Sequence, residues 1–176
     1  MQLHYITPFV LNSAGTIQVY KENEIPYAHL KLYYRSRFQK ILSEIDRNFY
    51  NNVQIESALC RFNIQQRPLR ETFWRKQYDV LYNDEWIGRI EGHATVTQAV
   101  LQLCYNDKTY IMKNPILGSS TVLKNEREEE LAHFRRVRDG VRKIDYIQVF
   151  ETNDLEKELV ICVYYLFTLL FSRSIR

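Results

Sequence analysis

The stretch Leu159–Phe171, which reads LVICVYYLFTLLF, decides the fold that this sequence predicts. Asn153 or Asp154 can cap a helix before it, and Glu156 suits the first turn of that helix. A helix that is apolar on every side is buried on every side. Its length of about 20 Å also equals the height of strands of about six residues. We therefore expect a helix over 155–171 that the rest of the chain encloses.

The same stretch could instead anchor the chain in a membrane. Only 14 uncharged residues separate Glu158 from Arg173, whereas a bilayer-spanning helix needs about 20. The hydroxyls of Tyr164 and Tyr165 would lie in mid-span, but inside a protein they can find hydrogen-bond partners. Residues 1–11 also lack the basic and apolar regions of a signal peptide. We therefore expect no transmembrane span and a cytoplasmic location, with peripheral association with a membrane left open.

Apolar and polar residues alternate through much of the remaining sequence, which predicts strands with one face exposed to water. The clearest apolar faces are Leu30, Leu32 and Tyr34; Trp74, Tyr78, Val80 and Tyr82; and Ala99, Leu101, Leu103 and Tyr105. Asn83-Asp84, Asn106-Asp107 and Asp139-Gly140 separate such runs, and these residue types tolerate the positive φ of tight hairpin turns. The middle and end of the chain are therefore predicted to form an antiparallel meander.

One amphipathic segment interrupts this pattern. Ser36 followed by Gln39 fits a capping box, and apolar residues then recur at helical spacing. These are Phe38, Ile41, Leu42, Ile45 and Phe49. We expect a surface helix over 36–49 that lays this apolar face on the sheet.

A buried helix limits the architectures that the strands can form. A sandwich or an open sheet would cover only one stripe of it, whereas a closed sheet of roughly eleven strands is wide enough to hold it. About eleven strand candidates precede residue 151. The predicted fold class is mainly β with two helices: a closed antiparallel barrel around the C-terminal helix, with the 36–49 helix outside.

This order of elements resembles a known family. A strand meander that contains the hairpin Tyr78–Ile90 (YDVLYNDEWIGRI), a second hairpin over Leu131–Phe150 and then an apolar helix is similar to the tubby C-terminal-like superfamily. That superfamily includes LURP-one-related proteins, phospholipid scramblases and small bacterial relatives. The resemblance implies a single barrel domain over 1–176 with about twelve strands. It implies no particular activity, since several branches of the superfamily have none assigned.

Residues suited to catalysis or metal binding do not form a recognisable pattern. The four histidines are far apart, without the spacing of a metal site, and the three cysteines lack a CxxC pair. They are His4, His29, His93 and His133, and Cys60, Cys104 and Cys162. We expect no cofactor, no metal, no catalytic residue, and reduced buried thiols. The alternative is a hydrolase-type enzyme in which Cys60 or Cys104 meets His93 in space.

The strongest charge cluster lies in the hairpin predicted at Asp139-Gly140. Residues 135–143 contain five basic side chains and one acid, a local charge of +4. We expect an anion-binding site formed by Arg136, Arg138, Arg142 and Lys143, with the three arginines on one face of the hairpin. The alternative is that the glutamates within residues 126–130 neutralise these cations.

The composition of the whole chain limits its partners. With 24 basic and 21 acidic residues in 176, the net charge of +3 is far below that of a typical nucleic-acid-binding protein. A second basic patch around Trp74, formed by Arg67, Arg70, Arg75 and Lys76, does not change this. We expect a non-enzymatic binding or scaffold module whose partner is an anionic phospholipid or a protein, while nucleic acid is disfavoured. The sequence leaves the oligomeric state open.

Overall fold

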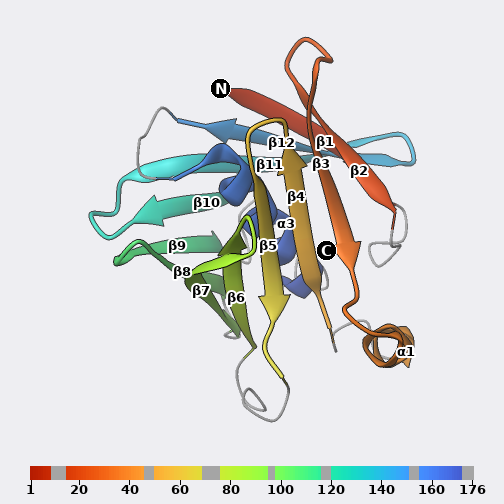
Figure 1. Ribbon diagram of the computed structural model, residues 1–176. Helices are drawn as coiled ribbons and strands as arrows, with labels where there is room; N and C mark the ends of the chain where they lie inside the picture. The colour runs from red at the N-terminus through yellow and green to blue at the C-terminus, as the bar shows by residue number, and fades with distance from the viewer. Residues whose placement is uncertain are drawn as a thin grey trace.

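The computed structural model of the protein describes residues 1–8, 15–45, 50–68, 76–94, 98–115, 120–150 and 155–171, apart from the side chains at 93, 94 and 115. This part of the chain forms twelve strands and two helices (Figure 1). The strands are β1 (Gln2–Thr7), β2 (Thr16–Lys21), β3 (Pro26–Tyr33), β4 (Asn52–Ser57), β5 (Arg61–Gln66), β6 (Gln77–Tyr82), β7 (Glu85–Ala94), β8 (Gln98–Tyr105), β9 (Lys108–Pro115), β10 (Ser120–Asn125), β11 (Glu130–Asp139) and β12 (Arg142–Val149). The helices are α1 (Arg37–Ile45) and α3 (Lys157–Phe171).

The strands form one closed antiparallel barrel. Each pairs with its neighbours in sequence, and β1 pairs with β12 from Gln2↔Gln148 to Thr7↔Lys143, which closes the barrel. A barrel of twelve strands leaves an interior wide enough for a helix. α3 fills this interior, and strands surround it in Figure 1. The predicted fold class, mainly β with a central helix and an external one, is confirmed.

α3 is buried along its whole length, which explains why its sequence is apolar on every side. Its residues are buried except for Lys157 and Leu170, which are partly exposed. Aromatic rings of the helix pack on the inner faces of strands. The ring of Tyr164 stacks on Phe134 at a centroid distance of 4.2 Å. The helix therefore supplies the centre of the hydrophobic core rather than covering it from outside.

The limits of α3 agree with the helix predicted over 155–171. The proposed capping residues Asn153 and Asp154 lie outside the described residues. No helix in the described ranges is both long and apolar enough to cross a membrane.

The predicted Asn-Asp turns are confirmed. Asn83 and Asp84 have φ values of 47° and 73°, and Asn106 and Asp107 have values of 49° and 58°. Positive φ at both central residues is typical of the two-residue hairpin turn whose twist matches that of the flanking strands. The predicted apolar faces also point into the barrel. Fully or almost fully buried members are Leu30, Leu32, Tyr78, Val80, Leu101 and Leu103, whereas Trp74 lies outside the described residues.

α1 begins where the capping box predicts. The amide N–H of Gln39 donates to Ser36 Oγ at 3.2 Å. The side-chain oxygen of Gln39 accepts from the amide of Arg35 at 2.9 Å, which completes a reciprocal cap. The helix is described as far as Ile45, and residues 46–49 of the predicted helix lie outside the described residues.

The face on which α1 docks was predicted wrongly. Phe38, Ile41 and Ile45 are exposed, and Ser43 is the one buried residue in the helix. The reason is that polar contacts hold the helix to the barrel. Ser43 Oγ donates to the carbonyl of Tyr50 at 3.2 Å, on the chain that leads into β4.

The barrel has two ends that carry different loops. In an antiparallel meander, successive connections lie at alternate ends. α1, which joins β3 to β4, and the β11–β12 turn therefore lie at one end, which we call the α1 end. The β2–β3, β4–β5, β6–β7, β8–β9 and β10–β11 turns lie at the opposite end, where α3 also begins.

Candidate anion-binding surface

The hairpin of β11 and β12 carries the predicted anion site. Its register pairs Asp139 with Arg142, and Arg138 with Lys143. The turn is therefore Gly140-Val141, one residue later than predicted. Gly140 adopts the left-handed region at φ 58°, which glycine does without the steric cost of a side chain.

This register corrects the predicted faces of the hairpin. A two-residue turn pairs even-numbered positions of one strand with odd-numbered positions of the other, and paired residues share a face. Arg136 and Arg138 therefore share a face with Lys143, whereas Arg142 lies with Asp139 on the opposite face. The prediction that all three arginines share one face is wrong.

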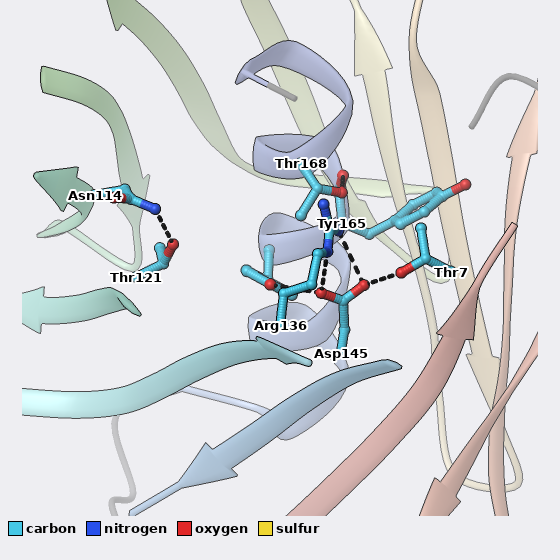
Figure 2. Close-up of polar contacts among 8 residues, drawn as sticks. Thr7, Asn114, Thr121, Arg136, Asp145, Tyr165 and Thr168 are labelled. Carbon is cyan, nitrogen blue, oxygen red and sulfur yellow. Dashed lines mark hydrogen bonds and ion pairs between the residues drawn. The ribbon is translucent and has the colours of Figure 1, made fainter. Parts of the chain in front are cut away.

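Arg136 points into the barrel and pairs with Asp145. Its Nε and Nη2 atoms donate to the two carboxylate oxygens at 2.8 and 3.0 Å, as Figure 2 shows. Asp145 is fully buried, and only 20% of the Arg136 side chain is exposed. Two parallel bonds from one guanidinium to one carboxylate are the strongest geometry for such a pair. The charge of Arg136 is therefore neutralised by Asp145 inside the barrel.

Two further hydroxyls bind the same carboxylate. Thr7 Oγ1 donates to one oxygen, and the hydroxyl of Tyr164 donates to the other at 2.9 Å. Burial alone would lower the pKa of Arg136, but the charge of Asp145 and its hydrogen bonds raise that pKa above its usual value. Burial and then the charge of Asp145 raise the pKa of Tyr164 well above its usual range. The network therefore ties β1, β11, β12 and α3 together through one carboxylate.

Sequence reasoning missed Asp145, although a signal for it exists. Ile147 and Val149 point inward along β12, and Asp145 has the same parity. An acid at an inward position of a strand needs a cation or several donors. Arg136 has the matching inward parity on β11, next to Phe134.

The remaining cations of the hairpin are exposed. Arg138, Arg142 and Lys143 lie on the surface around the turn residue Val141, whose exposure is 89%. In the part of the chain that the structure describes, their side chains form no ion pair. These three side chains are therefore available to an external anion.

The glutamates proposed to neutralise the hairpin lie at the opposite end of the barrel. Residues 126–130 form the β10–β11 turn and the start of β11, about 26 Å along the strand from Arg138. Glu128 instead contacts Lys113 and Lys124, at 3.4 and 3.1 Å. Those two lysines lower the pKa of Glu128 below its usual value.

Charge is divided between the two ends. Exposed acids gather on the turns opposite α1: Glu22, Glu24, Asp84, Glu85, Asp107, Glu126, Glu128, Glu129 and Glu130. Exposed bases gather at the α1 end: Arg35, Arg37, Lys40, Arg138, Arg142 and Lys143. Among the described residues the exposed acids of the α1 end are Glu44 and Asp139. This distribution would turn the α1 end toward a negatively charged surface.

The second basic patch is partly neutralised. Arg67 Nη2 lies 2.7 Å from Asp79, which also accepts a hydrogen bond from Trp86 Nε1 at 3.2 Å. Arg70, Trp74 and Arg75 lie outside the described residues.

Among the described side chains, no hydrogen bond joins a cysteine to a histidine. Cys162 is buried in α3, and burial raises its pKa far above the usual value. Cys60 faces Ser57 Oγ at 3.7 Å, and burial raises its pKa too. His4 packs against the ring of Tyr20, and the side chain of His93 is outside the described set. Within that set, no group of three or more His, Cys, Asp or Glu side chains is placed to hold a metal ion.

An open hollow lies on the outer surface of β1 and β2. None of the described residues that line it is a histidine, a cysteine or a charged residue. Its lining residues are Ile6, Pro8, Thr16, Ile17, Gln18 and Tyr20.

A closed barrel around a buried C-terminal helix, with hairpin turns displaying charge at its ends, defines a class of small binding domain. The family model for the tubby C-terminal like domain matches residues 3–171, which is almost the entire chain. The chain belongs to this family, as its element order indicated. No curated protein and no solved structure matches the chain. The family favours a non-enzymatic binding module.

Proposed function

We propose that this protein is a non-enzymatic module that binds an anionic phospholipid surface with the α1 end of its barrel. The unequal distribution of charge carries the proposal, because among the described residues exposed bases outnumber exposed acids at the α1 end and exposed acids outnumber exposed bases at the other end. Such a distribution orients the molecule in the field of an anionic membrane. The protein would then associate with the membrane peripherally.

Within this end, the hairpin cations make the headgroup contact. Arg138, Arg142 and Lys143 surround an exposed turn, and their side chains form no ion pair among the described residues. An arginine guanidinium presents a fork of donors that suits phosphate, and lysine adds a point charge. Arg136 does not contact the headgroup in this proposal. It supports the hairpin, since its pairing with Asp145 fixes β11 against β12.

The test is co-sedimentation with vesicles of phosphatidylcholine, with and without phosphatidylserine, over a range of salt concentration. The wild type should bind the anionic vesicles, and binding should weaken as salt rises. Changing Arg138, Arg142 and Lys143 together to Gln should weaken binding by about 3 kcal/mol, roughly a hundredfold, because each cation near such a surface contributes about 1 kcal/mol.

A matched control removes the same number of charges from the opposite end. Lys21 ends β2, Lys108 begins β9 and Arg127 lies on the β10–β11 turn there, and their change to Gln should leave vesicle binding unchanged. Equal loss in both variants would mean that net charge alone acts. Unchanged binding by the hairpin variant, or no binding by the wild type at low salt, would contradict the proposal.

A further inference from the structure

α1 displays an apolar stripe to solvent. The exposures of Phe38, Ile41 and Ile45 are 65%, 55% and 74%, although the three recur at the helical spacing that usually faces a core. Figure 1 shows α1 outside the barrel. Three neighbouring large apolar side chains on one exposed helix face are unlike the singly exposed ones that any surface carries.

The outward orientation of this stripe is fixed by contacts on the other side of the helix. Asn52 Nδ2 donates to Gln39 Oε1 at 3.1 Å and to the carbonyl of Tyr33 at 3.2 Å. Ser43 is 2% exposed and donates to the carbonyl of Tyr50. Rotating the helix to bury the stripe would break these bonds and leave buried polar groups without partners. The stripe therefore stays on the surface unless an external partner covers it.

The charges beside the stripe indicate what that partner is. Arg35, Arg37 and Lys40 are exposed on α1 and on the turn before it, and Glu44 is the one exposed acid among residues 34–45, the part of this segment that the structure describes. Cations next to an apolar face are the pattern of helices that lie in the headgroup region of an anionic bilayer. A small water-soluble anion would pair with the cations but leave the apolar stripe exposed to water. An anionic bilayer can pair with the cations and also cover the stripe.

The opposite end of the barrel provides a contrast. Ile25, Leu59 and Trp86 are exposed there as well. They lie on or beside three different turns and not on one helix face, and exposed acids outnumber exposed bases among the described residues of that end. An anionic membrane would repel that end.

We infer that α1 is an interfacial membrane helix, whose residues Phe38, Ile41 and Ile45 enter the boundary between headgroups and acyl chains of an anionic bilayer. This inference rests on the proposed lipid-binding function and adds an apolar contact to it. The basic hairpin lies at the same end of the barrel, so one membrane plane can meet both. Lys and Arg then bind headgroups while the stripe is buried below them.

Insertion is tested by placing a fluorophore in the stripe. The variant Phe38→Trp, mixed with vesicles of phosphatidylcholine and phosphatidylserine whose acyl chains carry bromine, should show quenching beyond that of the wild type. The control is Leu59→Trp, which places a tryptophan at an even more exposed position on a turn at the opposite end and should gain no quenching. Quenching of Leu59→Trp but not of Phe38→Trp would overturn the inference.

A second variant removes the stripe while keeping the contacts that hold α1. Phe38, Ile41 and Ile45 are changed together to Ser, and thermal unfolding followed by circular dichroism verifies the fold. Binding to the same vesicles should fall at least roughly tenfold, because the apolar area no longer leaves water. The residual binding should become more sensitive to salt, since it is then electrostatic alone.

The two proposals fail in distinguishable ways. The inference would be overturned if the Ser variant bound vesicles with the same affinity and salt sensitivity as the wild type and position 38 showed no quenching. The lipid-binding function would then still stand. If the Ser variant lost binding and the hairpin variant did not, the inference on α1 would stand, and the proposed headgroup contact by the hairpin would be rejected. A wild-type dimer that the Ser variant lacks, without quenching by brominated lipid, would assign the stripe to a second copy of the chain and overturn the inference.

Discussion

Asp145 is the centre of a buried polar network inside the barrel. It is fully buried and accepts hydrogen bonds from an arginine, a threonine and a tyrosine. The carboxylate accepts from all of these donors and lies against the guanidinium of Arg136, which needs a partner inside the barrel. The residue therefore acts as an anchor between β12 and its neighbours rather than as a chemical group for a substrate.

Removing this carboxylate should be costly. Asp145→Ala leaves the guanidinium of Arg136 buried without a counter-charge, and the expected loss is about 3–5 kcal/mol in the free energy of unfolding. Urea denaturation followed by circular dichroism measures it. Arg138→Ala is the control, because Arg138 is exposed on the same strand and should change stability by less than about 0.5 kcal/mol. Similar small effects for both substitutions would show that the pair contributes little.

For single residues, the sequence predicted local backbone conformation better than the partners of side chains. Arg136 was selected as a surface cation because arginines crowd the hairpin, and a one-residue error in the turn hid the fact that it faces Asp145. The identity of a cross-strand partner depends on register, and a single step of register changes every pairing. By contrast, Asn83, Asp84, Asn106 and Asp107 determine their turns locally, and those turns were predicted correctly.

Among the elements, α3 and α1 show what hydrophobic pattern does and does not determine. The all-round apolar sequence of α3 leaves burial as its one stable environment, so its place in the barrel could be predicted. α1 is amphipathic, and its pattern predicted a helix but not which face docks. That choice depends on hydrogen bonds to the segment that leads into β4 and to β4 itself: Gln39 accepts from Asn52, and Ser43 donates to Tyr50.

Deleting the central helix should abolish the fold. A chain that ends at Glu158 loses the apolar side chains at the centre of the core, and burial of each large one contributes about 1.5–3 kcal/mol. Their sum exceeds the stability of a typical domain, about 5–15 kcal/mol. Thermal unfolding by calorimetry should show no cooperative transition for this chain, whereas a chain ending at Phe171 should keep one. A cooperative transition in the shorter chain would contradict the central role of α3.

At the scale of the whole molecule, tyrosine hydroxyls make stability depend on alkaline pH. Burial, followed in Tyr105 by the hydrogen bond to Glu156, raises the pKa of Tyr33 and Tyr105 to about 12 from the usual 10. Burial raises the pKa of Tyr78 further still. Between pH 10 and 12 the unfolded chain has lost these protons and the folded chain keeps them. Folding is therefore opposed increasingly as pH rises through this window.

The free energy of unfolding should consequently be level below about pH 9 and fall above about pH 10. Each tyrosine that keeps its proton in the folded state contributes up to about 1.4 kcal/mol per pH unit to the slope. Urea titrations at pH 8 to 11 measure this slope, and Tyr78→Phe should reduce it. Stability that is constant up to pH 11 would show that these hydroxyls titrate freely in the fold.

Closure of the barrel through β1 and β12 also has a consequence for synthesis. A ribosome that has released only β1 to β11 holds a nascent chain whose sheet has two unpaired edges and an inner face without its helix. Unpaired strand edges can pair with another chain, and uncovered apolar faces promote aggregation. Such an intermediate is therefore prone to associate with other chains until the final segment emerges. The barrel can close around its core only after β12 and α3, the last described elements in the sequence, have been synthesised.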